Sequence, residues 1–248
     1  MWNNPRLLNA VAGLVAATAV VALLFAGAQW LLRSSLFPLH EITVHGDLDH
    51  TARDDVARAT RDRLRGNFFA VDLAEVRAGL EALPWVRRVQ VRRAWPDRLD
   101  VTIEEHVTLA RWGKDALVNT HGERFAGRSD AALPVLDGPD GTASEVAQRF
   151  LRFSEILAPL GLTVKHVVLT PRFAWQLTLD GELHVELGRD VGSHPAESRL
   201  ARFAAAYPAT LAKLEQRHDY VDLRYPNGFA LRVPGIELDV GDKRESKG

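Results

Sequence analysis

Histidines and paired carboxylates are the residues of this chain whose spacing could support chemistry. His40, His45 and His50 recur every five residues, and Glu104 stands next to Glu105. Histidine clusters can hold a metal ion, and two neighbouring carboxylates can act as general acid and base. However, a spacing of five does not place histidines on one face of a helix or strand, and adjacent strand residues point to opposite faces. We therefore expect solvated side chains at these positions, with no catalytic residue and no metal site.

The rest of the sequence also lacks the short motifs of catalysis and nucleotide binding. No Gly-x-Ser-x-Gly, Walker, Gly-x-Gly-x-x-Gly or His-Glu-x-x-His segment occurs in the 248 residues. The chain has no cysteine, which excludes thiol nucleophiles, disulfides, Cys-ligated zinc and iron–sulfur clusters. We expect a protein without enzymatic activity, without a cofactor and without a small-molecule substrate, although a site built from scattered residues would leave no such motif.

Charge argues against a nucleic-acid partner, because 31 basic and 32 acidic side chains leave a net charge of −1. The densest basic cluster fits an exposed strand face, and contact with an acidic protein surface or anionic lipid is the alternative. This cluster consists of Arg87, Arg88, Arg92, Arg93 and Arg98.

An apolar segment near the N-terminus predicts a membrane anchor. Residues 7–32 contain no charged side chain. As a helix they would be about 39 Å long, enough to cross a hydrocarbon core of about 30 Å. A cleavable signal peptide is the alternative, because Ala26, Gly27 and Ala28 are small residues at a suitable spacing. The length of the apolar run favours an uncleaved helix that holds the remaining chain against one membrane face.

Residues 37–106 are predicted to form a first module of the order β-α-α-β-β. The segment 41–46 alternates like a strand, and apolar stripes over residues 51–66 and 72–83 predict two helices. Two further alternating segments, 86–94 and 98–105, each have one apolar and one charged face. Together they predict a small sheet covered by two helices on one side.

Residues 107–234 are predicted to form a second, strand-rich module with helices at about 144–157 and 196–214. Its last two strands, 220–225 and 229–233, flank Pro226-Asn227-Gly228, a favourable hairpin turn. Residues 235–248 are mostly polar, and we expect a flexible tail. The fold class expected for the whole chain is α+β.

Several segments of the two predicted modules match, in order, the motifs of one protein family. The first module contains Asn67-Phe68-Phe69-Ala70-Val71-Asp72, then Leu83-Pro84-Trp85-Val86, then Trp95-Pro96-Asp97-Arg98-Leu99. The second contains Trp175-Gln176-Leu177, Leu187-Gly188-Arg189 and Tyr220-Val221-Asp222-Leu223-Arg224-Tyr225. The chain thereby resembles the FtsQ/DivIB family, and its first module resembles the POTRA domain of that family.

The resemblance implies a non-enzymatic division protein of the bacterial inner membrane, located at the septum. Residues 1–6 would form a short cytoplasmic tail, and both modules would lie in the periplasm. It implies a scaffold that links early and late divisome proteins and helps control septal peptidoglycan synthesis. The partners implied are FtsB and FtsL, and further divisome proteins such as FtsK, FtsW and FtsI.

In the family, the last strand of the β domain receives an added strand from FtsB. The resemblance carries this contact onto Arg224, Tyr225, Asn227 and Val233, and more loosely onto Arg172. Val233 stands where the family usually has tryptophan, so an aromatic anchor is replaced, and Thr108 stands where proline is usual. Two other functions stay open: an exported POTRA-containing envelope assembly protein, and a periplasmic domain that acts on peptidoglycan.

Overall fold

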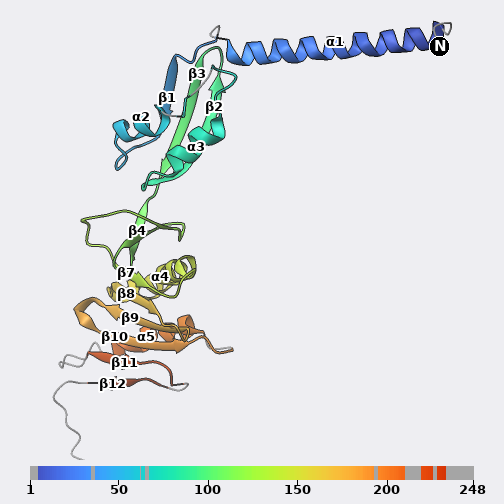
Figure 1. The fold of residues 1–248 in the computed structure, drawn as a ribbon. Helices are drawn as coiled ribbons and strands as arrows, with labels where there is room; N and C mark the ends of the chain where they lie inside the picture. Colours follow the sequence, from blue (N-terminus) through green and yellow to red (C-terminus); the bar gives the residue numbers. More distant parts are fainter. Residues whose placement is uncertain are drawn as a thin grey trace, which may run out of the picture. The chain divides into compact units, whose positions relative to one another are not determined.

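The computed structural model describes residues 5–34, 37–61, 63–64, 67–192, 195–209, 219–225 and 228–232. The chain divides into two compact units, Met1–His106 and Val107–Gly248. Helices and strands occur in both units (Figure 1). The predicted α+β class is therefore confirmed.

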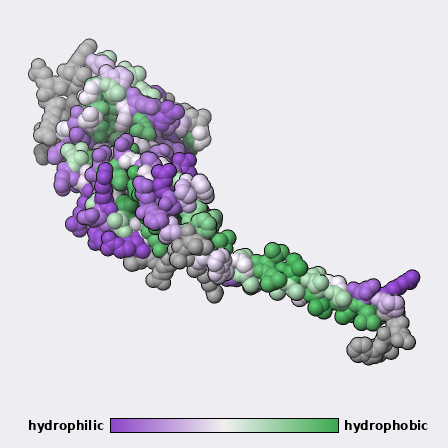
Figure 2. All heavy atoms as spheres, turned by 90° about the horizontal axis from the view of Figure 1, so that it is seen from above, coloured by the Kyte–Doolittle hydropathy of each residue, from purple (hydrophilic) through white to green (hydrophobic). Residues whose placement is uncertain are grey.

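The N-terminal helix α1, Pro5–Arg33, has the composition of a membrane-spanning segment. Its apolar part, Leu8–Leu31, has a mean hydropathy of 2.3, and none of it is buried within the protein. Figure 2 shows the helix as a run of mostly green, hydrophobic residues. A helix of this length and composition fits a single-pass membrane protein.

The first unit continues as a sheet of the order β1-β3-β2, in which β1 is parallel and β2 antiparallel to β3. Its strands and helices are β1 (Glu41–His45), α2 (Arg53–Arg61), α3 (Leu73–Glu81), β2 (Val86–Ala94) and β3 (Arg98–Glu105).

The alternating pattern of β3 explains how this unit builds its core. Leu99, Val101 and Ile103 point to the helices and are at most 2% exposed. Val76 and Leu80 of α3 meet them in the same apolar cluster. The helix α3 begins where the sequence predicts, because the Asp72 carboxylate accepts hydrogen bonds from the first free backbone amides, Ala74 N at 2.8 Å and Glu75 N at 3.2 Å.

Within the described residues of the second unit, nine strands form one sheet of the order β12-β11-β10-β9-β8-β7-β4-β5-β6. The first strands are β4 (Thr108–Trp112), β5 (Ala116–Asn119), β6 (Arg124–Phe125) and β7 (Val135–Asp137). The later strands are β8 (Val164–Leu169), β9 (Ala174–Leu179), β10 (His184–Arg189), β11 (Tyr220–Asp222) and β12 (Ala230–Arg232).

Two helices pack on one face of this sheet, α4 (Ala143–Leu157) and α5 (Ala196–Ala206). Phe153 of α4 and Phe203 of α5 are fully buried in the same apolar cluster as a row of strand residues. The row crosses five neighbouring strands in register and consists of Leu136, Val167, Leu177, Val185 and Val221.

Short helical turns extend or join these elements: η1 (Ala158–Leu160), η2 (Asp180–Glu182) and η3 (Tyr207–Ala209). The helix expected over residues 196–214 is α5 followed by η3, and residues 210–218 lie outside the described part. The strands β6 and β7 were not predicted, because two or three residues are too short to show an alternating pattern.

Glu105 differs from the expectation that it is a solvated charge. Its side chain is 8% exposed. It accepts hydrogen bonds from the backbone amides of Asp49 (3.2 Å), His50 (3.1 Å) and Thr51 (2.7 Å). The His50 ring stacks on Trp85 with centroids 3.8 Å apart. The interpretation of Glu105 as a surface charge was wrong because the carboxylate holds the loop that precedes α2.

Candidate partner-binding edge

The two C-terminal strands, β11 and β12, lie at one margin of the nine-stranded sheet. β11 is parallel to β10 and antiparallel to β12. In the part of the chain that the structure describes, β12 pairs with β11 alone. A strand can pair on both sides, and no described strand pairs with the outer row of N–H and C=O groups of β12.

Two arginine–aspartate pairs support this margin. Arg232 of β12 donates to the carboxylate of Asp219 through Nε at 3.2 Å and Nη2 at 3.1 Å. Its guanidinium also lies over the ring of Tyr220, at 5.7 Å from the centroid. Both members of this ion pair are exposed to solvent, so they orient the hairpin more than they stabilise it.

The pair Arg224–Asp222 is closer and more buried. Arg224 Nε donates to both carboxylate oxygens of Asp222 at 2.9 and 3.1 Å, and Nη2 donates at 2.6 Å. The backbone N–H of Arg224 adds a bond of 3.0 Å. The bonds from Arg224 lower the pKa of Asp222, and the same carboxylate raises the pKa of Arg224. The Asp222 side chain is 7% exposed and that of Arg224 is 58% exposed, so a cation is fixed in place at the surface.

Gly188 of β10 makes room for the Arg224 side chain. It has φ +72°, and a Cβ atom at this position would stand 2.9 Å from Arg224 Cγ. The ladder between β9 and β10 also shifts register between Glu186 and Gly188. A glycine is therefore required both by the backbone conformation and by the close approach of Arg224.

Three of the predicted partner-binding residues lie at one end of the sheet. Arg224 and Tyr225 lie two and three residues beyond the end of β11, and Arg172 lies in the turn between β8 and β9. β9 is antiparallel to β8 and β10, and β11 is parallel to β10. The last residues of β8 and β11 therefore lie at the same end of the sheet as the first residues of β9. The Tyr225 side chain is 54% exposed. The other two predicted residues, Asn227 and Val233, lie outside the described residues.

Two residues at this end were not predicted from the sequence. Phe173 follows Arg172, has φ +57° and is 56% exposed, so the turn presents an aromatic ring beside a cation. The sequence signal that could have indicated Phe173 is an aromatic residue directly after the turn residues Thr-Pro-Arg. Asp222 was also missed as the residue that orients Arg224, because its role depends on the contact and not on a motif.

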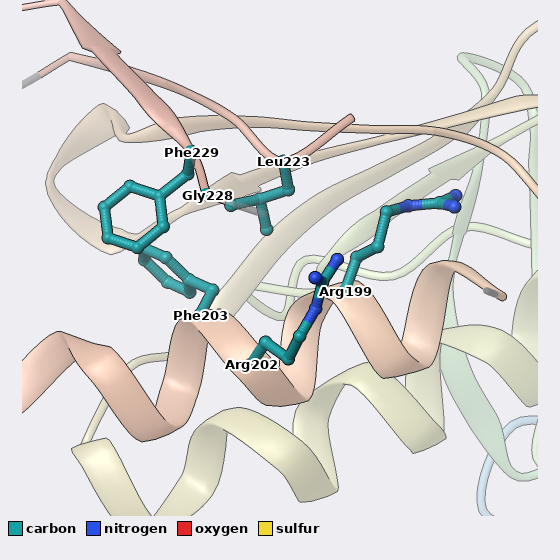
Figure 3. A pocket seen from close by; sticks show the side chains of 6 residues that line it. All are labelled: Arg199, Arg202, Phe203, Leu223, Gly228 and Phe229. Carbon is teal, nitrogen blue, oxygen red and sulfur yellow. The ribbon is translucent and has the colours of Figure 1, made fainter. Parts of the chain in front are cut away.

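A cavity of about 180 Å³ lies between α5 and the β11–β12 segment (Figure 3). Phe203 and Phe229 line one side of it with ring centroids 5.9 Å apart, and Arg199 and Arg202 point along the other side. Arg199 Nη2 donates to the carbonyl of Arg189 at 2.6 Å, which ties α5 to the end of β10. The cavity thus lies beneath the strands at the sheet margin.

The histidines and carboxylates of the described residues are spread over separate neighbourhoods. The described residues contain no group of three or more His, Cys, Asp or Glu side chains placed to hold a metal ion. His40 pairs with Asp97, and His50 contacts Glu105 and Trp85, so these two histidines have separate neighbours.

Comparisons with known proteins agree with this architecture. Residues 37–106 match the family model of the FtsQ-type POTRA domain, and residues 110–224 match the model of the C-terminal part of cell division protein FtsQ/DivIB. The sheet and two helices of the first unit are therefore a POTRA domain.

Similar full-length relatives are each named "Cell division protein FtsQ". The relative from Burkholderia pseudomallei is 43% identical over 98% of this chain and 100% of its own length. Those from Bordetella pertussis and Nitrosospira multiformis are 37% and 39% identical over 100% and 94% of this chain, and over 98% and 99% of their own lengths. The chain belongs to the FtsQ/DivIB family of cell division proteins.

Proposed function

We propose that this protein is a non-enzymatic scaffold of the divisome that binds the FtsB–FtsL pair by strand addition at β12. The family is one of cell-division scaffolds and not a known enzyme family, and it implies protein–protein contacts within the division machinery. The observation that carries the proposal is the outer side of β12, which pairs with no strand among the described residues.

An added strand from FtsB gains backbone hydrogen bonds along β12, and side chains at its end give specificity. Arg172 and Arg224 present cations at this end, and Tyr225 and Phe173 present aromatic surface. This combination suits a partner segment with acidic side chains beside apolar ones, since arginine and tyrosine often dominate binding energy. Asn227 and Val233 belong to the same proposed contact.

The proposed location is the bacterial inner membrane at the division septum. In this arrangement α1 spans the bilayer once, the few residues before it are cytoplasmic, and the POTRA domain and the β domain are periplasmic.

Binding of FtsB and FtsL would bring FtsW and FtsI under control of the scaffold and thereby regulate septal peptidoglycan synthesis. FtsK is a further proposed partner. The proposed domain bounds are 37–106 for the POTRA domain and 107–234 for the β domain. The tail expected over 235–248 lies outside the described residues.

Calorimetric titration of the full chain in nanodiscs with the periplasmic segment of FtsB tests the contact. Replacing Tyr225 by alanine removes an exposed aromatic side chain, and we expect about tenfold to hundredfold weaker binding, the usual range for a central aromatic contact. The matched control is Arg124→Ala, an exposed residue of β6 at the opposite margin of the sheet. We expect Arg124→Ala to leave the affinity unchanged. Unchanged affinity of Tyr225→Ala with an unaltered melting curve would place the interface elsewhere.

A cellular experiment separates a scaffold from a peptidoglycan-acting enzyme. Depletion of a division scaffold should produce filaments with segregated chromosomes and no constriction. Incubation of the purified protein with peptidoglycan should release no soluble fragments. Cells of normal length after depletion, or release of fragments, would overturn the proposal.

A further inference from the structure

The membrane-proximal end of the POTRA domain carries exposed aromatic side chains. Phe37, Phe69 and Trp95 are 37%, 41% and 78% exposed. The rings of Phe37 and Phe69 form an edge-to-face pair with centroids 5.2 Å apart. Exposed apolar side chains that gather in one place mark surfaces that meet another protein or a membrane.

Hydrogen bonds connect these aromatic residues to the end of α1. Phe37 is only four residues beyond Arg33, so it lies within about 14 Å of the end of the helix. The side-chain amide of Asn67 donates to the carbonyls of Leu31 at 2.7 Å and Ser34 at 3.0 Å. Its Oδ1 atom accepts from Phe69 N at 3.0 Å. Asn67 is 5% exposed, so this joint between helix and domain is itself shielded from water.

Trp95 belongs to the same end of the domain through two further contacts. Arg93, two residues before it, donates to the carbonyls of Phe68 at 2.8 Å and Phe69 at 3.2 Å. The carbonyl of Asp97, two residues after it, accepts from the N–H of His40 at 3.0 Å. The turn that carries Trp95 is therefore held between the loop of Phe69 and the chain that leaves α1.

We propose that Phe37, Phe69 and Trp95 form a lipid-contacting surface by which the POTRA domain rests on the bilayer that α1 spans. Aromatic rings are favoured at the level of the lipid headgroups, where an apolar face and a polar edge are both satisfied. Arg92 and Arg98 flank the Trp95 turn and are exposed, although Arg92 also pairs with Asp100 at 3.4 Å, and exposed arginines of this kind suit phosphate groups of anionic lipids. The proposal requires α1 to lie in a bilayer, but it is independent of the proposed binding to FtsB.

Membrane contact at this end would limit the rotation of the POTRA domain relative to α1. A domain attached only through a flexible linker samples many heights and orientations above the bilayer. The Asn67 hydrogen bonds together with three inserted rings would instead hold the sheet at one end against the headgroups.

The absence of cysteine from the chain allows a direct test with single labels. An environment-sensitive fluorophore is attached at Ala70→Cys, an exposed position next to Phe69. A second label at Asp47→Cys lies beyond the other end of β1, about 20 Å along the strand direction from Glu41 at its start. The full chain is placed in nanodiscs of phosphatidylethanolamine and phosphatidylglycerol that contain a lipid with a brominated acyl chain as quencher.

We expect the label at position 70 to be quenched and the label at position 47 to be unaffected. Because tethering alone brings position 70 near the membrane, the decisive sample carries Phe37→Ser, Phe69→Ser and Trp95→Ser together. This variant should lower the quenching at position 70 by at least about twofold, since the rings provide the insertion. The matched control replaces an exposed apolar residue toward the other end of β1, Val44→Ser, and should leave the quenching unchanged.

Circular dichroism and the melting curve show whether the serine variants remain folded. Equal quenching at positions 70 and 47 would overturn the proposal. Quenching at position 70 that persists in the folded triple variant would also overturn it, because proximity would then come from the tether alone.

Discussion

The substitution Asp222→Asn tests whether the carboxylate holds Arg224 at the sheet margin. Asparagine keeps the size of the side chain and can still accept the bond from Arg224 N. It loses the charge that three guanidinium contacts of 2.6 to 3.1 Å depend on. The variant therefore removes the ionic part of the pair while it keeps the backbone turn.

The expected cost follows from the burial of the two partners. Hydrogen bonds to charged groups contribute about 1.5–3 kcal/mol, whereas exposed ion pairs contribute about 0–1 kcal/mol. Here the carboxylate is 7% exposed but the guanidinium is 58% exposed, so solvent screens part of the interaction. We expect a loss of about 1–2 kcal/mol in the free energy of unfolding, equivalent to a melting temperature lower by about 2–8 °C in a chain of this size.

The stabilisation by the Asp222 carboxylate should also depend on pH. Arg224 lowers the pKa of Asp222, so the unfolded chain takes up this proton at a higher pH than the folded protein. The stabilisation is complete above the ordinary aspartate pKa of about 4 and is lost as pH falls through the lower folded value. The difference between wild type and Asp222→Asn should therefore be largest near neutral pH and should shrink below about pH 4.

The assay is thermal unfolding of the full chain, followed by tryptophan fluorescence, to which the buried Trp112 and Trp175 of the β domain contribute among the six tryptophans. Asp219→Asn is the matched control because its pair with Arg232 is exposed at both ends, and we expect a much smaller change. A double-mutant cycle with Arg224→Gln isolates the interaction from other effects of each substitution. An equal melting temperature for wild type and Asp222→Asn, or a difference that does not depend on pH, would refute the reasoning.

Two more predictions concern other positions. Glu105→Gln should lower the stability of the POTRA domain by about 1–3 kcal/mol, since one charged acceptor serves three backbone amides. Burial raises the pKa of Glu105, but the bonds from Thr51 and His50 outweigh it and lower the pKa, so this stabilisation should fade below about pH 4, and a pH-independent denaturation midpoint would contradict it. Gly188→Ala should weaken binding of the FtsB segment because the new Cβ displaces Arg224, as titration would show. Gly181→Ala is its control, because Gly181 has the same φ of +72° with no atom within 4 Å of an added Cβ, and equal affinities of the two variants would count against the role of Arg224.

Much of the fold follows from local patterns in the sequence. The alternation of Leu99, Val101 and Ile103 places three residues in the core, and the Asp72 cap marks the start of α3. Long segments are predictable because the spacing of apolar residues within one helix or strand shows which of its faces is buried. The nine-residue strand β2 and the fifteen-residue helix α4 are examples.

Pairings between distant segments could not be predicted in this way. β7 has three residues and lies between β4 and β8, parallel to both. Its position depends on a connection through α4 that returns the chain to the sheet. Burial of Glu105 likewise depends on the backbone amides of residues 49–51, which are more than fifty positions away.

In the candidate site, too, some residues could be named from the sequence and others only from the structure. Arg172, Arg224 and Tyr225 were named from a resemblance, and the end of the sheet at which they lie follows from strand pairing. The roles of Asp222 and Gly188 required side-chain geometry, because neither residue type alone distinguishes a surface turn from a support for Arg224.

Hydrogen exchange at β12 tests the central claim most directly. The amides of residues 228–232 are followed in the full chain in nanodiscs, with and without a saturating periplasmic segment of FtsB. Strand addition should slow exchange there by about tenfold or more, because amides on the outer side of β12 gain acceptors. Residues 124–125 in β6, at the opposite margin, should exchange unchanged. The same exchange rates at 228–232 with bound FtsB would contradict the account.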